Sequence, residues 1–231
     1  MTVALLSAEE CKRLLFLHMR LECVGIDVRG DMVRIPGDEP DGIARLYLAK
    51  IPGDVFYAYR FDVPLDIRSQ IDVLSVETRL HDHGRVKQIL EAHAPCMHVH
   101  YGKSYVFPAI PPENDYPDVI EVDEFSQSLF DLFEPPGGKQ AHAVFAVLKD
   151  GKIVSACQSS RENERAGEAW VRTSPEYRGR GYARQVVSAW AVSLLQQNKT
   201  PFYSHVNNNL ASKGLAESLG LVQYISDTGY E

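Results

Sequence analysis

A short segment, residues 178–183, places two glycines and two arginines directly before a long run with helical periodicity. The free N–H groups in the first turn of a helix carry partial positive charge. Glycine lets the backbone close around an anion because no Cβ stands in the way. Arg178 and Arg180 can add charge-assisted hydrogen bonds at the rim. The segment therefore predicts a site for a phosphate or pyrophosphate.

Two other phosphate motifs do not fit this chain. The dinucleotide fingerprint G-x-G-x-x-G would need a glycine where the chain has Arg184. A P-loop around Gly138 and Lys139 fails because Phe133 and Gln140 occupy two of its required positions. The pattern that fits residues 178–183 is [QR]-x-x-G-x-[GA].

The segments around this motif predict alternating strands and helices. Apolar runs indicate a strand at 118–122, a helix at 123–133, and two strands joined by a turn at Lys149-Asp150-Gly151. Further strands are expected at 167–173, 201–206 and 221–225. Helices are expected from 182 and from 209 to 219, where Gly220 stands at the C′ position. The predicted order is β–α–β–β–β–α–β–α–β.

The first half of the chain has a mixed pattern that says little about function. Ser7 and Glu10 have the spacing of a capping box and predict a helix start. Strands are expected on either side of a turn at residues 52–54, followed by a helical stretch at 66–93 and a strand at 96–108. Four prolines between 108 and 117 mark a compositional break. We therefore predict an N-terminal region at 1–112 and a second domain at 117–231.

Composition excludes some classes of protein. The 231 residues carry a formal net charge of −7, which argues against a general cationic surface for nucleic acid. No segment approaches the ~20 apolar residues of a membrane span. The cysteines are widely spaced, which favours free thiols and a cytoplasmic location; they are Cys11, Cys23, Cys96 and Cys157.

The strand, loop and helix around residues 178–183 resemble the acyl-CoA-binding motif of the GNAT acyltransferase superfamily. Residues 209–224 are similar to the downstream helix of that superfamily, and the resemblance covers about the last half of the chain. Within the superfamily, the chain looks closest to a bacterial subgroup with an extra N-terminal region. The resemblance implies an α/β (α+β) fold with a mixed, splayed sheet flanked by helices in the C-terminal half. The N-terminal mixed α/β region would shape an acceptor pocket, form a dimer, or be a decayed copy of the same fold.

The resemblance also implies acetyl-CoA as the co-substrate. Its pantetheine arm would insert between two strands of the sheet, its pyrophosphate would bind the loop, and the far end of the arm would meet the last helix. The residues carried over by position are Val171, Arg172 and Thr173 for the arm, Arg178, Gly179, Arg180, Gly181, Tyr182 and Ala183 for the pyrophosphate, and Asn209 and Ser212 for the far end.

Acetyl transfer to an amine needs a base, because an amine with a pKa near ~10.4 is mostly protonated at neutral pH. Glu168 is the candidate, since it stands on the expected strand ten residues before Arg178. Its apolar neighbours Ala169 and Trp170 could raise its pKa by desolvation. The alternative is a glutamate at a strand edge that bonds a neighbouring arginine.

Two further roles follow from the resemblance. A backbone N–H near Thr173 would meet the oxyanion. A tyrosine on the last helix usually reprotonates the leaving thiolate, but this chain has Ala216 at the matching position. Either the thiolate leaves unaided, or Tyr203, His205 or Tyr224 is the donor; the alternative for each ring is packing against the sheet.

Histidines in the first half raise the question of a metal. His98 and His100 alternate along one expected strand and would share a face, as zinc ligands can. No group of ligands has zinc-finger spacing, so we predict surface or interface histidines and no metal. The aromatic residues of the two strand regions there are expected in the core, with a substrate wall or a dimer face as the alternative.

The sequence predicts a cytoplasmic N-acetyltransferase that moves an acetyl group from acetyl-CoA to the primary amine of a small molecule. Neither nucleic acid nor a membrane is expected as a partner, and a homodimer remains open. One alternative is a non-catalytic acyl-CoA-binding sensor, supported by Ala216. The other is an acetyltransferase that modifies a protein.

Overall fold

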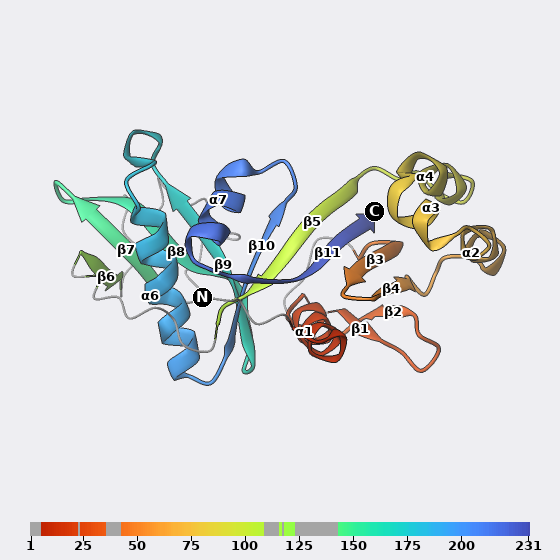
Figure 1. The fold of residues 1–231 in the computed structure, drawn as a ribbon, viewed down its shortest axis with the longest axis horizontal. Coiled ribbons are helices and arrows are strands. Elements are labelled where there is room, and N and C mark those ends of the chain that lie inside the picture. The colour runs from red at the N-terminus through yellow and green to blue at the C-terminus, as the bar shows by residue number, and fades with distance from the viewer. Residues whose placement is uncertain (1–5, 23, 36–42, 109–115, 117, 123–142) are drawn as a thin grey trace. The chain divides into compact units, whose positions relative to one another are not determined.

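The computed structural model describes residues 6–22, 24–35, 43–108, 116, 118–122 and 143–231 (Figure 1). The helix expected at 123–133, Cys23 and most of the proline-rich segment lie outside these ranges. The chain divides into two compact units. Unit 1 comprises Met1–Ser104, His205–Asn208 and Gln223–Glu231, and unit 2 comprises Tyr105–Ser204 and Asn209–Val222. Unit 1 contains segments from both ends of the chain, so no single boundary separates the two units. The domain boundary at residues 112–117 stays a prediction.

Unit 1 begins with helix α1 (Ala8–Leu21), whose start is the predicted capping box. The Ser7 hydroxyl accepts the Glu10 amide at 3.2 Å, and the Glu10 carboxylate accepts the Ser7 amide at 3.0 Å. A hairpin of β1 (Val24–Ile26) and β2 (Met32–Arg34) follows, which the sequence pattern did not reveal.

The sheet of unit 1 has the strand order β4-β3-β11-β5. Strands β3 (Leu46–Ile51) and β4 (Asp54–Tyr59) form the expected hairpin, with Gly53 at φ 74° in the turn. The last strand, β11 (Val222–Tyr230), pairs antiparallel with β3, and β5 (Val99–Val106) lies on its other side. The C-terminal strand therefore completes the N-terminal unit.

The helical stretch expected at 66–93 consists of three short helices in unit 1. They are α2 (Leu65–Asp72), α3 (Val76–His81) and α4 (His83–Glu91). Ser75 caps α3 and Asp82 caps α4, each by accepting a backbone amide three residues on. The caps explain why one continuous helix does not form.

Unit 2 contains the strand order β10-β9-β8-β7-β6. The strands are β6 (Val119–Val122), β7 (Val144–Lys149), β8 (Lys152–Glu162), β9 (Ala166–Thr173) and β10 (Thr200–Val206), of which residues 200–204 belong to this unit. Asp150 at φ 51° and Gly151 at φ 73° form the predicted turn between β7 and β8. Neighbours from β6 to β9 are antiparallel, whereas β9 and β10 are parallel. The sheet is therefore mixed, and the predicted fold class is confirmed.

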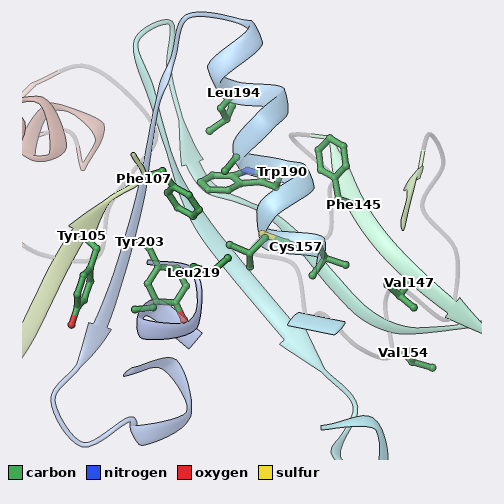
Figure 2. Packing of buried hydrophobic residues seen from close by; sticks show 14 residues of the cluster. Tyr105, Phe107, Phe145, Val147, Val154, Cys157, Trp190, Leu194, Tyr203 and Leu219 are labelled. Atoms are coloured by element: carbon green, nitrogen blue, oxygen red, sulfur yellow. The ribbon is translucent and has the colours of Figure 1, made fainter. Parts of the chain in front are cut away.

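Two helices belong to unit 2, α6 (Tyr182–Gln196) and α7 (Leu210–Ser218). Trp190 of α6 is 1% exposed, and its indole N–H donates to the Ser159 hydroxyl of β8 at 2.9 Å. Its ring packs edge to face against that of Phe107, with the ring centroids 5.9 Å apart. Figure 2 shows the two rings beside each other. This core fixes α6, and with it the loop that precedes it. Within the described ranges, no helix is both long enough and apolar enough to cross a membrane.

Candidate functional site

The parallel strands β9 and β10 of unit 2 pair over only three positions. Ala166, Gly167 and Glu168 face Thr200, Pro201 and Phe202, and the described residues show no further pair although β9 continues to Thr173 (Figure 1). The two strands therefore separate beyond Glu168. On its other side β9 stays paired with β8 up to Thr173.

Because β9 and β10 separate, a gap opens between them, and part of the β9 backbone faces this gap instead of pairing with β10. The Ser174 amide donates to the Val154 carbonyl at 2.9 Å, and hydrogen-bonded pairs alternate along an antiparallel ladder. The main chain of Arg172 therefore bonds β8, whereas the N–H groups of Val171 and Thr173 point away from β8. The Ser155 hydroxyl steadies this end of β9, since it lies 2.8 Å from the Thr173 hydroxyl.

The loop between β9 and α6 holds a second group of backbone donors. Gly179 and Gly181 adopt φ 73° and 82°, and a Cβ added to either would meet nothing within 4 Å. Gly181 is the N-cap of α6 and offers no side-chain cap. Among the described residues, the amides from Gly179 to Arg184 have no hydrogen-bond acceptor, whereas the Gln185 amide bonds the Gly181 carbonyl at 3.2 Å. The helix start thus keeps the open, electropositive amides that an anion needs.

The two arginines of the loop are exposed, and each donates one hydrogen bond to a nearby backbone carbonyl. Arg178 Nε donates to the Thr173 carbonyl at 3.2 Å, and Arg180 Nη2 donates to the Glu176 carbonyl at 3.0 Å. A guanidinium has five N–H donors, so both keep donors for a ligand. The sequence pattern missed a third cation, because Lys149 reaches the loop only through the β7–β8 turn. Its Nζ lies 5.5 Å from the centre of the Tyr182 ring.

Glu168 lies where the strands separate. Its side chain is 8% exposed, and its carboxylate accepts the Ser204 hydroxyl of β10 at 2.5 Å. Arg161 Nη1 lies 3.8 Å from its other oxygen. The structure places Glu168 beside an arginine, as the alternative reading expected, and its role as a base stays a prediction. Ser204 and Arg161 were not foreseen, because β9, β10 and β8 bring them together only in the folded chain.

Tyr203 is the candidate proton donor that unit 2 contains. It is 2% exposed in the core cluster that also holds Ala216, and Figure 2 shows its ring beside α7. Burial raises the pKa of its phenol, while a side-chain hydrogen bond with Ser212 opposes the shift. The Asn209 side chain caps α7 by accepting the Ser212 amide at 3.0 Å. The structure therefore places Asn209 and Ser212 at the start of α7, and Tyr203 in the same core cluster as Ala216, which lies further along that helix.

The other two candidate donors belong to unit 1. The Tyr224 hydroxyl lies 2.5 Å from Nδ1 of His18, and Nδ1 of His205 lies 2.9 Å from the Val206 carbonyl. Within either unit alone, the described His, Cys, Asp and Glu residues form no group of three with ligand atoms inside 4.8 Å of one another.

Comparison with known proteins adds to this geometry. A family model described as GNAT acetyltransferase matches residues 103–230. A GNAT-family protein from Novosphingobium aromaticivorans is 20% identical over 58% of this chain and 65% of its own, with a TM-score of 0.50, so the match spans just under two thirds of that protein. An acetyltransferase from the GNAT family of Colwellia psychrerythraea is 11% identical over 98% of this chain and 97% of its own, with a TM-score of 0.50. At these identities the solved structures show similarity of fold alone. The search of curated proteins found no match.

Proposed function

Since the chain belongs to the GNAT acetyltransferase family, we propose that it moves an acetyl group from acetyl-CoA to the primary amine of a small molecule. The observation that supports this most is the separation of β9 from β10 directly before a loop with open amides. Three described cysteines, Cys11, Cys96 and Cys157, are free and buried, which suits the reducing cytoplasm as the proposed location.

The residues present fit acetyl-CoA. The amides from Gly179 to Arg184, helped by Arg178 and Arg180, would hold the pyrophosphate, because they are open and carry the positive end of α6. The main chain of Val171 and Thr173 would bond the amide groups of the pantetheine arm. Arg172 would contribute through its side chain, since its main chain bonds β8. Asn209 and Ser212 would meet the far end of the arm. The co-substrate supplies the acetyl group as an activated thioester.

Glu168 is the proposed base. Removing a proton from an amine of pKa ~10.4 costs about 4–5 kcal/mol at pH 7, and a positioned carboxylate recovers part of it. Burial and the bond from Ser204 hold this carboxylate in one place beside the gap. The Thr173 N–H, which points away from β8, would stabilise the negative charge that develops on the carbonyl oxygen.

Tyr203 is the proposed proton donor to the leaving sulfur. Burial raises the pKa of this phenol and so keeps it protonated. A thiolate with a pKa near ~8.5 needs only modest help to leave. Tyr203 would then serve in place of the tyrosine that the family carries where this chain has Ala216.

A non-catalytic acyl-CoA sensor is the second candidate. Ala216 favours it, because a buried alanine in the core cannot donate a proton. Release of free thiol from acetyl-CoA in the presence of an amine distinguishes the two candidates, since a sensor binds the co-substrate without consuming it.

The central experiment measures acetyl-CoA binding by calorimetry and thiol release over a panel of small primary amines. The test variant is Gly181→Asp, which puts a carboxylate at the open amides; Gly151→Asp is its control. Both glycines have φ above 70° and open space around a Cβ, so the backbone strain is matched. We expect Gly181→Asp to weaken acetyl-CoA binding about 10- to 100-fold by charge repulsion and by capping the helix, and Gly151→Asp to bind normally. Equal binding by both variants, or no binding by the wild type, contradicts the proposal.

A further inference from the structure

Lys149 is a cation beside the loop of unit 2 that the proposed binding of the pyrophosphate does not use. It is the last residue of β7, whereas the loop joins β9 to α6, and all of these elements belong to unit 2. Its side chain is 34% exposed, so a ligand in solvent can reach the ammonium group. Lys149 can therefore bind a charged group of a ligand that lies on the loop.

Two tyrosine rings hold cations at separate places beside this loop. The centroids of the Tyr177 and Tyr182 rings lie 6.5 Å apart. Lys149 Nζ lies 5.5 Å from the centre of the Tyr182 ring, and Arg180 Cζ lies 5.1 Å from the centre of the Tyr177 ring. A cation over an aromatic ring is attracted by the ring quadrupole. The position of the Lys149 ammonium group is therefore set by Tyr182, at a different ring from that of Arg180.

Tyr182 also links Lys149 to the open amides of the loop. Tyr182 is the first residue of α6, and its own N–H is one of the amides without an acceptor among the described residues. The reach of one tyrosine side chain therefore separates the ammonium group from these main-chain donors. Space over the loop is open, since a Cβ added at Gly179 or Gly181 would meet nothing within 4 Å. This geometry suits a ligand with two phosphate groups close together, one on the amides and one at Lys149.

Lys149 has one weak anionic partner in the structure. Its Nζ lies 3.5 Å from Oδ2 of Asp118, the residue directly before β6. The Asp118 side chain is 57% exposed, and an exposed ion pair contributes little because water and salt screen both charges. A phosphate monoester carries more negative charge than a carboxylate and has three acceptor oxygens. A phosphate at this position can therefore displace Asp118.

We propose that Lys149 exchanges Asp118 for the 3′-phosphate of the co-substrate and so makes the site selective for a 3′-phosphorylated nucleotide. Coenzyme A carries its diphosphate and its 3′-phosphate on one ribose, so one sugar ring separates the two groups. The amides bind the first and Lys149 binds the second. This proposal rests on the proposed function, because it takes acetyl-CoA as the co-substrate. The amides alone would not distinguish acetyl-CoA from its 3′-dephospho form.

The experiment measures the dissociation constants of acetyl-CoA and 3′-dephospho-acetyl-CoA for the full chain, by calorimetry. The test variant is Lys149→Met, and the control is Lys213→Met, which removes another exposed lysine of unit 2 whose Nζ lies 3.9 Å from Glu217. We expect the wild type to bind acetyl-CoA at least tenfold more tightly than the 3′-dephospho form. Lys149→Met should weaken acetyl-CoA at least fivefold and the 3′-dephospho form less than twofold, whereas Lys213→Met should change neither by twofold.

Asp118→Asn tests the exchange itself. Removal of the competing carboxylate should tighten acetyl-CoA binding about twofold to threefold and leave the 3′-dephospho form unchanged. The same change made in Lys149→Met should have no effect, because the two residues act on each other. Gly151→Asp keeps its use as a control, since a Cβ at Gly151 would lie more than 4 Å from every atom of Lys149.

Three outcomes overturn the proposal. They are equal binding of the two compounds by the wild type, equal weakening of both compounds by Lys149→Met, and weaker acetyl-CoA binding by Asp118→Asn. Circular dichroism checks that the variants fold. If Lys149→Met does not fold, Asp118→Asn decides the question, since unchanged binding of acetyl-CoA would then count against the exchange.

Thiol release measured on the same samples separates this proposal from the proposed function. Thiol release by a wild type that binds the two compounds equally supports the acetyl transfer and removes the role of Lys149. A preference for the 3′-phosphate that depends on Lys149, in a protein that releases no thiol, supports this role and removes the transfer. Binding of neither compound contradicts both proposals.

Discussion

The loop before α6 in unit 2 and the side chains around Asp227 in unit 1, which include His18, Tyr47 and His100, are built in opposite ways. The loop offers main-chain N–H groups from six consecutive residues, and their donors do not depend on side-chain identity. The side chains around Asp227 come from α1, β3, β5 and β11, and each contact depends on one residue. The loop presents the positive ends of amide dipoles, whereas burial raises the pKa of the Asp227 carboxyl. Loss of one side chain should therefore affect the loop mildly and a side-chain site strongly.

The largest effect is expected at Glu168, a side-chain site within unit 2. Glu168→Gln keeps the shape and removes the base, so kcat should fall about 100- to 1000-fold. The dissociation constant of acetyl-CoA should stay within about twofold, as calorimetry can check. Glu164→Gln, an exposed neighbour, is the control. A kcat within threefold of the wild type would exclude Glu168 as the base.

A smaller loss of rate is expected for Tyr203→Phe. Removing the phenol that would protonate the leaving sulfur should lower kcat about tenfold, because the thiolate can leave without help. Tyr105→Phe is the matched control, since Tyr105 is also a buried phenol of the same core. Equal rates for the two variants in the thiol-release assay would show that Tyr203 packs in the core and does not donate the proton.

Single arginine changes in the loop test the main-chain argument directly. Arg178→Met and Arg180→Met should each weaken acetyl-CoA binding about threefold to tenfold, because the backbone donors remain. Arg165→Met, an exposed arginine outside the loop, should have no effect in the same titration. A hundredfold loss from either loop variant would mean that side chains dominate this site too.

The smallest effect concerns stability and comes from Asp227. Because burial raises its pKa in the folded chain, the folded state holds its proton to higher pH than the unfolded state, and the wild type loses stability as pH rises from the ordinary value of 3.8 through the raised one. Asp227→Asn lacks this loss. The melting temperature of Asp227→Asn minus that of the wild type should therefore increase by about 2–4 °C between pH 4 and pH 8. A difference that does not change with pH, measured beside Asp66→Asn, which changes an exposed acid in the first turn of α2, would contradict the assigned shift.

Local signals in the sequence predicted much of unit 2. The turn at Asp150 and Gly151 needs positive φ, which the residue types reveal, and Gly220 at φ 65° ends α7 as expected. The fold class and the family could be predicted for the same reason, because the loop and its flanking elements are contiguous in the chain. Both predictions were confirmed. The roles assigned to these elements in binding and catalysis stay predictions.

Non-local contacts could not be predicted in the same way. The bond from Ser204 to Glu168 joins two strands whose pairing the local pattern does not encode. The groups that act on Asp227 come from positions as distant as His18, so no window of sequence contains them together. The histidine pattern drew attention to His100, but its neighbour Asp227 comes from the other end of the chain.

The place of β11 between β3 and β5 has a consequence for synthesis on the ribosome. Translation delivers β3 and β5 long before the strand that separates them, so unit 1 cannot finish its sheet until β11 has left the exit tunnel. Until then both strands present unpaired edges, which favour association with other chains. A stop codon after Val222 should therefore yield a nascent product retained by chaperones, even though every residue upstream is intact.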